Sequence, residues 1–277
     1  MRDAMCLLLI AYHQHPRYPL LLLANRDEFY QRPTVPAQPW DDSPITAGRD
    51  LEAGGTWLGV TPTGRVAAVT NIREPGAPEP ARVLSRGEIP VNFLAGEQPP
   101  ADYAAGLPAP RYRGFNALLF DHRASAPLVC AGNRHAPFAI VPGVHGISNG
   151  APDAPWPKVT HGCRSLSALV SALPQQLDTE AFVTRALALL ADDTRAPDTH
   201  LPDTGVGLAT ERALSPIFVR IDSEDGIRND SPLHQGYGTR ASTLVAVDSS
   251  GGVQLWEQTY IDGRVSGDLR YFSYPSI

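Results

Sequence analysis

Short apolar blocks separated by polar, proline-rich segments run along the chain, and their periodicity predicts both strands and helices. Nearly continuous apolar runs at 6–12 and 20–24 are typical of strands that are covered on both faces. Further strand patterns occur at 56–60, 65–70, 115–120, 128–131, 138–141, 144–147, 217–221, 242–247, 253–260 and 269–274. Apolar residues at helical spacing predict helices over 159–173 and 179–190, and a shorter helix is predicted over 85–95.

The segments between these blocks are polar or rich in proline and are predicted to be loops, at 29–43, 73–81, 99–110 and 192–208. The 27 prolines are spread along the chain, so they mark many loops rather than one disordered tail. We see no internal repeat and no interior linker. The sequence therefore predicts one α+β domain over residues 1–277, in which strands flank a central helical pair.

Composition and charge narrow the class of protein. With 277 residues, 43% hydrophobic and 19% charged, the chain is long enough to bury a core. A net charge of −6 without a basic cluster makes nucleic acid and anionic membrane poor partners. The apolar runs are far shorter than the ~20 residues of a membrane span, so we expect no stable membrane insertion. Three cysteines without a Cys-x-x-Cys motif favour a reducing compartment, and we expect a cytoplasmic protein.

Cys6 is the first candidate for chemistry, because it directly follows Met5 and opens an apolar strand. If translation starts at Met5, removal of the methionine leaves Cys6 with a free α-amine. An amine of pKa ~7.7–8.0 can take the proton of a thiol of pKa near ~8.5, so no histidine is needed as base. The alternative is a buried structural cysteine, which the four residues before Met5 favour.

Four polar residues, Asn25–Glu28, end the second apolar run and face back toward Cys6 if the two strands form a hairpin. Arg26 beside an amine and a thiol would lower the pKa of both groups and favour the thiolate. The carboxylate of Asp27 could hold the ammonium form of the amine in place. The alternative is a charged turn without chemistry.

Two asparagines are candidates for binding an oxyanion, because a side-chain amide donates hydrogen bonds to developing negative charge. Asn71 follows the strand predicted at 65–70, and Asn149 follows Ser148. Either could equally be a turn asparagine. Arg240, before the strand predicted at 242–247, could place a positive charge in a cleft or could be a surface residue.

Two other kinds of site are not supported by the sequence. Residues 146–150 match the G-x-S-x-G motif of serine hydrolases, but the prolines that follow deny the helix that this motif requires. The histidines show no zinc-type spacing, and we find no glycine loop for phosphate or dinucleotide. We therefore expect neither a metal nor a cofactor.

Taken together, the sequence resembles the NRDE family, named for residues 25–28 and also known as the transport and Golgi organisation protein two family. The resemblance is carried by blocks in the family's order: Met5-Cys6-Leu7, Asn25-Arg26-Asp27-Glu28, Gly54-Gly55-Thr56-Trp57-Leu58-Gly59, Thr70-Asn71, Ser85-Arg86-Gly87, Tyr112-Arg113-Gly114-Phe115-Asn116, Ser148-Asn149, Pro155-Trp156-Pro157-Lys158 and Tyr237-Gly238-Thr239-Arg240. The family is similar in turn to N-terminal-nucleophile hydrolases of the penicillin V acylase and bile salt hydrolase type. This implies a four-layer αββα sandwich.

The resemblance also implies roles for the candidate residues. Cys6 would be the nucleophile, Arg26 and Asp27 would set its pKa and orientation, and one of the two asparagines would bind the oxyanion. Arg240 would be the second arginine of the site. Family members begin Met-Cys, whereas four residues precede Met5 here, and we attribute this difference to a misassigned start.

We therefore expect Cys6 to hydrolyse a linear amide bond of a small molecule, and a thioester such as an acyl-coenzyme A suits thiolate attack equally well. The resemblance also implies roles in haem movement and in handling of lipid or acyl-coenzyme A. The alternative is thus a non-catalytic carrier of a haem-like or acyl ligand on the same scaffold. A hydrolase would lose its function in Cys6→Ala, whereas a carrier would retain it unless the thiol binds the cargo.

Overall fold

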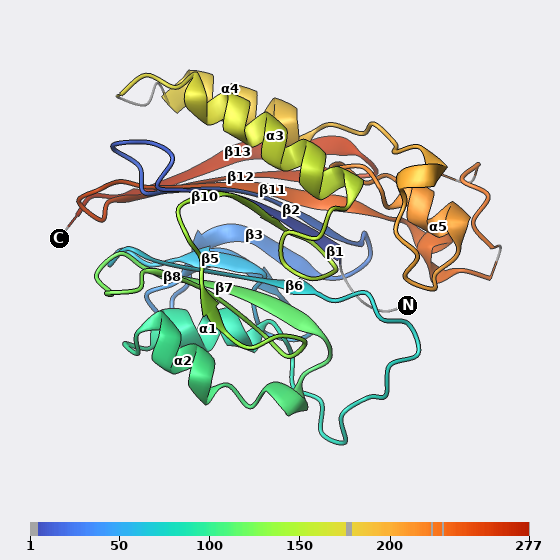
Figure 1. The fold of residues 1–277 in the computed structure, drawn as a ribbon, viewed down its shortest axis with the longest axis horizontal. Coiled ribbons are helices and arrows are strands. Elements are labelled where there is room, and N and C mark those ends of the chain that lie inside the picture. The colour runs from blue at the N-terminus through green and yellow to red at the C-terminus, as the bar shows by residue number, and fades with distance from the viewer. Residues whose placement is uncertain (1–4, 176–178, 223, 229, 277) are drawn as a thin grey trace.

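The computed structural model describes residues 5–175, 179–222, 224–228 and 230–276. Two antiparallel sheets lie face to face, and helices cover the outer face of each sheet (Figure 1). The layers therefore run helix, sheet, sheet, helix. This confirms the α+β class and the αββα sandwich.

The first sheet contains six strands in the order β10-β1-β2-β11-β12-β13. These strands are β1 (Met5–Tyr12), β2 (Leu20–Phe29), β10 (Gly143–Ile147), β11 (Tyr237–Val247), β12 (Val253–Ile261) and β13 (Arg264–Tyr274). Strands β1 and β2 form an antiparallel hairpin in which Cys6 is opposite Arg26. The polar end of β2 thus returns beside Cys6, as predicted.

The second sheet contains seven strands in the order β3-β4-β5-β6-β7-β8-β9. These strands are β3 (Thr34–Pro39), β4 (Thr46–Asp50), β5 (Leu58–Val60), β6 (Arg65–Asn71), β7 (Phe115–Asp121), β8 (Leu128–Gly132) and β9 (Phe138–Ala139). The loop predicted over 29–43 was wrong at β3, which tolerates two prolines because it is an edge strand. The strand predicted at 217–221 was also wrong, because only Arg220 forms an isolated bridge there, to Gly238.

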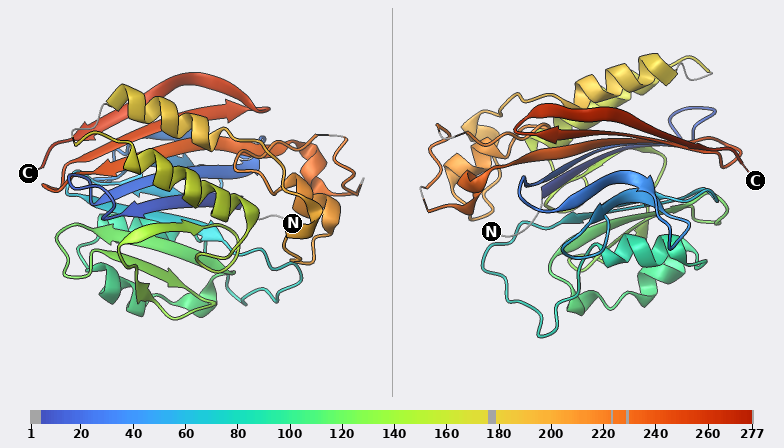
Figure 2. Two further views of the ribbon diagram at one scale, coloured as in Figure 1. Left: turned by 45° about the horizontal axis from the view of Figure 1, so that its top comes forward. Right: turned by 180° about the vertical axis from the view of Figure 1, so that it is seen from behind.

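Two pairs of helices cover the sheets. Helices α3 (Pro157–Ser171) and α4 (Thr179–Leu190) cover the first sheet, and α1 (Glu88–Ala95) and α2 (Pro100–Gly106) cover the second (Figure 2). Helix α2 lies in the predicted loop 99–110, so that prediction was wrong. A fifth helix, α5 (Leu208–Ala213), lies at the end of the sandwich where the described chain starts (Figures 1 and 2). Among the described residues, no helix is both long and apolar enough to cross a membrane.

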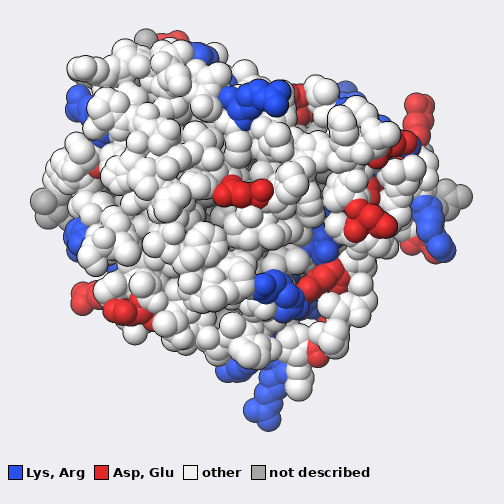
Figure 3. All heavy atoms as spheres, in the orientation of Figure 1, with Lys and Arg blue, Asp and Glu red and all other residues white. Residues whose placement is uncertain are grey.

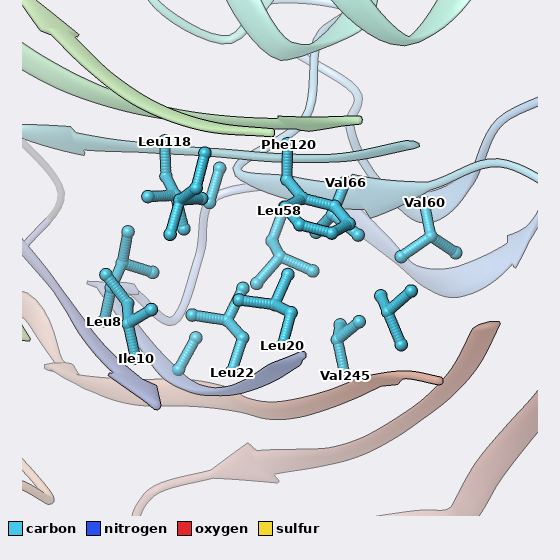
Figure 4. Close-up of a cluster of buried hydrophobic side chains, with 14 of the residues drawn as sticks. Leu8, Ile10, Leu20, Leu22, Leu58, Val60, Val66, Leu118, Phe120 and Val245 are labelled. Carbon is cyan, nitrogen blue, oxygen red and sulfur yellow. The ribbon is translucent and has the colours of Figure 1, made fainter. Parts of the chain in front are cut away.

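Alternation along the strands fills the space between the layers. Leu8 and Ile10 of β1 point between the sheets, whereas Leu7 and Leu9 pack with residues of α3 and α4. Figure 4 shows the inner cluster, where leucines of the first sheet meet Leu58, Val66, Leu118 and Phe120 of the second. Both faces of β1 are buried, which explains its nearly continuous apolar run.

Candidate active site

Cys6 lies at the start of β1, at the end of the sandwich near α5. It has the same alternation as Leu8 and Ile10, so its side chain faces the space between the sheets. A cavity of about 420 Å³ opens there, which we call the cysteine cavity. Its lining includes Cys6, Arg26 and Glu28 of the first sheet and Trp57 and Asn71 of the facing part of the chain.

Two glycine-containing blocks form a wall of the cysteine cavity. The Thr56 N–H donates a hydrogen bond of 3.1 Å to the Gly87 carbonyl. A Cβ atom added to Gly55 would lie 2.8 Å from the Gly87 Cα, so a side chain cannot be accommodated without a shift of the backbone. The blocks 54–59 and 85–87 are thus held together by backbone contact.

The Cys6 side chain is almost completely buried, and its surroundings disfavour the thiolate. Burial raises the pKa of Cys6 from 9.0 to about 12. The charge of Asp27 raises this pKa further, and Arg26 acts in the opposite direction. When residues precede Cys6, its thiol is therefore protonated at neutral pH, and it can act as a nucleophile only if a base is brought to it.

Arg26 is fixed beside Cys6 by several contacts. Its guanidinium lies over the Trp57 ring, 4.3 Å from the ring centroid. It forms ion pairs of 3.5 Å with Glu28 and of 3.5 Å with Asp50. These contacts hold a positive charge at the cysteine cavity in a single position.

Asp27 lies opposite Met5 in the hairpin, and therefore beside the peptide bond that joins Met5 to Cys6. One carboxylate oxygen, Oδ1, accepts a hydrogen bond of 2.7 Å from the Thr239 hydroxyl. The other, Oδ2, is buried without a hydrogen-bond partner among the described residues. Burial raises the pKa of Asp27 to about 6, and the charge of Lys158 is the largest influence that lowers it.

Ser148 connects Cys6 to both candidate asparagines. Its hydroxyl lies 3.0 Å from the Cys6 carbonyl oxygen and 3.2 Å from Asn149 Oδ1. Asn149 Nδ2 donates a hydrogen bond of 3.0 Å to the Asn71 carbonyl. The Thr70 hydroxyl donates to the Ser148 carbonyl at 2.8 Å. The sequence indicated the asparagines but not the role of Ser148, which it marked only by the G-x-S-x-G match and by its block with Asn149.

Arg240 is bound to a different part of the chain from the other candidate residues. Its guanidinium donates hydrogen bonds of 2.8 Å to the Phe29 carbonyl, 3.0 Å to the Tyr30 carbonyl and 3.2 Å to the Arg32 carbonyl. It lines a smaller cavity of about 180 Å³, which also contacts Arg26 and Trp57. The structure therefore brings four of the five other predicted residues around Cys6, and the fifth, Arg240, holds the neighbouring chain before β3.

A larger cavity adjoins the cysteine cavity. It has a volume of about 1040 Å³, and its lining includes residues 72–80, Tyr112 and both asparagines. Asn71 and Arg113 line both cavities, so the two cavities adjoin at these residues. Figure 3 shows acidic and basic side chains intermingled toward the α5 end of this view, with others scattered along the opposite edge. In the described part of the chain, no group of three or more His, Cys, Asp or Glu side chains is suited to a metal ion.

The chain is an αββα sandwich in which a buried cysteine near the start of the first strand lies opposite an arginine of the next strand, and an aspartate follows that arginine. Comparison with known proteins gives the family. The family model described as Transport and Golgi organisation 2 matches residues 5–262. The chain belongs to this family, which confirms the resemblance found in its sequence blocks.

Two mammalian relatives match over nearly their whole length. The chain is 32% identical over 271 residues to the Transport and Golgi organization protein 2 homolog of Bos taurus, covering 93% of this chain and 94% of the relative. The homolog of Homo sapiens is 32% identical over 280 residues and covers 95% of each chain. Among solved structures, a mutant conjugated bile acid hydrolase from Clostridium perfringens aligns with 98% of each chain, at 8% identity and a TM-score of 0.44.

Proposed function

We propose that this chain is an N-terminal cysteine hydrolase that cleaves a linear amide or thioester bond of a small molecule in the cytoplasm. One observation carries the proposal: Asp27, which is opposite the residue before the cysteine that lines the cleft, has a buried carboxylate oxygen, Oδ2, without a hydrogen-bond partner among the described residues. A buried acceptor without a donor indicates a missing group. The α-ammonium group of a mature chain that begins at Cys6 supplies that donor.

The chemistry needs one base, and the free amine of Cys6 provides it. The amine takes the proton from Sγ, and the thiolate attacks the carbonyl carbon of the substrate to form a tetrahedral oxyanion. The ammonium then gives its proton to the leaving nitrogen or sulfur as that bond breaks, which leaves an acyl group on Sγ. Water, deprotonated by the same amine, hydrolyses the acyl thioester and restores the thiol.

The surrounding side chains stabilise these steps. Arg26 supplies a fixed positive charge near Sγ, and Asp27 Oδ2 accepts a hydrogen bond from the α-ammonium group. Asn149 Nδ2 donates one hydrogen to the Asn71 carbonyl, and we assign its second hydrogen to the oxyanion. The substrate extends from the cysteine cavity past Asn71 and Arg113 into the larger cavity.

The first test is the start of the mature chain, measured by intact mass and N-terminal sequencing of protein expressed from its native gene. We expect a chain that begins at Cys6. Screens with amide and thioester substrates should then detect hydrolysis that is abolished in Cys6→Ala and retained in Cys163→Ala, the matched control in α3. A mature chain that retains Met5, or hydrolysis that persists in Cys6→Ala, would contradict the proposal.

A carrier of a haem-like or acyl ligand is the second candidate. The observation that favours it is the larger cavity, whose walls include prolines of the segment 72–80 and which does not include Cys6 in its lining among the described residues. A carrier should bind haem or acyl-coenzyme A with the same affinity in the wild-type protein and in Cys6→Ala. Titration followed by absorbance or calorimetry distinguishes it from the hydrolase.

A further inference from the structure

Lys158 is unusual in both its identity and its position. It is the only lysine in the sequence, where the combined number of Lys and Arg residues is 23. It is the second residue of α3, yet it is only 3% exposed. A lysine at this depth is rare unless its charge is paired. The proposed chemistry does not use it.

The Lys158 ammonium faces the site from the helix layer. Asp27 exerts the strongest attraction on it, and weaker charge interactions involve Arg73, Cys6 and Glu211. These groups lie on β2, after β6, on β1 and on α5, so the lysine is surrounded by the elements that form the site. Burial lowers the pKa of Lys158 to about 8, and the charge of Asp27 opposes that shift.

Lys158 and Asp27 differ from the structural ion pairs of this protein. Arg65 and Asp121 form a buried pair at 2.6 Å, and Arg73 is directly paired with Glu211. In contrast, Lys158 Nζ and Asp27 Oδ2 are both buried without a hydrogen-bond partner among the described residues. Two opposite charges that attract each other without a direct bond leave hydrogen-bonding capacity on both sides. This arrangement is typical of a site that awaits another group.

We propose that Lys158 is a positioning residue for the Cys6 nucleophile, whose ammonium group keeps the Asp27 carboxylate charged so that it can bind the Cys6 α-ammonium group. The inference rests on the proposed function, because only a chain that begins at Cys6 has that group. Without Lys158, the pKa of Asp27 would be higher, and a larger fraction of the carboxyl would be neutral and unable to accept from the ammonium group.

The first experiment measures how fast iodoacetamide alkylates Cys6 as a function of pH, by peptide mass mapping of the purified protein. The variants are Lys158→Met, Asp27→Asn and the double variant. The alkylation rate of Cys6 should rise as Asp27 ionises. In Lys158→Met, we expect this rise to occur at higher pH, so that the alkylation rate at neutral pH is about tenfold lower than in the wild-type protein. The double variant should be no slower than Asp27→Asn, since Lys158 acts through Asp27.

Two results would overturn the role of Lys158: a pH profile of Cys6 alkylation that is unchanged in Lys158→Met, or a double variant whose loss of rate is the product of the losses in Lys158→Met and Asp27→Asn. Either result would leave the proposed function standing, provided that wild-type Cys6 is reactive. If wild-type Cys6 reacts no faster than the same thiol in the urea-unfolded chain, the proposed function fails, and the role of Lys158 fails with it.

A second experiment needs no substitution of Lys158. Because the chain has one lysine, protein labelled with ¹³C,¹⁵N-lysine gives a single set of side-chain NMR signals. We expect the Lys158 signals to shift as Asp27 titrates near pH 6, and this shift to be absent in Asp27→Asn. Lys158 signals that do not respond in the pH range where Asp27 titrates would show that the two charges are not coupled, and would refute the proposed role.

Discussion

The reactivity of Cys6 should depend on whether any residue precedes it. In a chain that retains Met5, burial raises the pKa of this thiol from 9.0 to about 12. Each pKa unit changes the thiolate fraction at neutral pH tenfold, so Cys6 should form about 1000-fold less thiolate than an ordinary cysteine. When the chain begins at Cys6, the free amine adds a base and, when protonated, a positive charge. Both should restore reactivity.

The comparison requires two preparations, one that begins at Met1 and one produced from a start codon at Met5 and processed to Cys6. Iodoacetamide is added at neutral pH, and alkylation of each cysteine is followed by peptide mass mapping. Cys130 and Cys163 serve as internal references, because burial raises the pKa of Cys130 to about 12 and that of Cys163 to about 11 in either preparation.

We expect Cys6 in the longer chain to react about 1000-fold more slowly than in the urea-unfolded protein, and Cys6 in the shorter chain to react far faster than Cys130. Two results would refute this reasoning. In the first, Cys6 of the longer chain reacts at the rate of the unfolded thiol, which would mean that burial does not suppress the thiolate. In the second, both preparations react equally slowly, which would mean that the amine does not activate the thiol.

Three further predictions concern single side chains. Because the folded-state pKa of Lys158 is lowered from 10.5 to about 8, the unfolded chain holds this proton at higher pH than the folded chain. The free energy of unfolding should therefore rise by about 2 kcal/mol between about pH 8 and about pH 9.5, and urea titration of Lys158→Met should lack this rise. Ser148→Ala removes the donor to the Cys6 carbonyl and should lower stability by about 1–3 kcal/mol in thermal denaturation; no loss of stability would argue against this buried hydrogen bond. Asn149→Ala should lower kcat about 100-fold or more with little change in KM, whereas an equal loss in Asn71→Ala would move the oxyanion role to Asn71.

The fold could be predicted from the sequence where burial is decided locally. The runs that became β1 and β2 are apolar at every position because both of their faces are covered. Strand β3 was missed because Pro36 and Pro39 argue against a strand unless it is known to lie at a sheet edge. The apolar residues at 217–221 are buried by packing with distant segments. Their sequence pattern is therefore that of a strand, although they form only an isolated bridge and no ladder of strand hydrogen bonds.

In the candidate site, too, the sequence predicted what local strand pairing decides and missed what distant packing decides. Arg26 and Asp27 could be placed beside Cys6 because a hairpin fixes which residues are opposite each other. The burial of Lys158 depends on how α3 packs against β1, and its block with Pro155, Trp156 and Pro157 marked the position without indicating that the lysine is buried. Arg240 follows Gly238 and Thr239 directly, but its direction depends on an irregularity in the pairing of β11 with β2 between Thr239 and Ala241. Sequence spacing alone does not specify that irregularity.

The position of β1 inside the first sheet also limits when a methionine that precedes Cys6 could be removed under the proposed function. One neighbour of this strand, β2, is synthesised almost immediately, but the other, β10, and the covering helix α3 leave the ribosome much later. Until then Cys6 lies in an incomplete sheet, and afterwards it is buried in the completed sandwich. Under the proposed function, removal of Met5 would therefore compete with folding, and a chain that misses this step would fold without the free amine that the proposed chemistry uses.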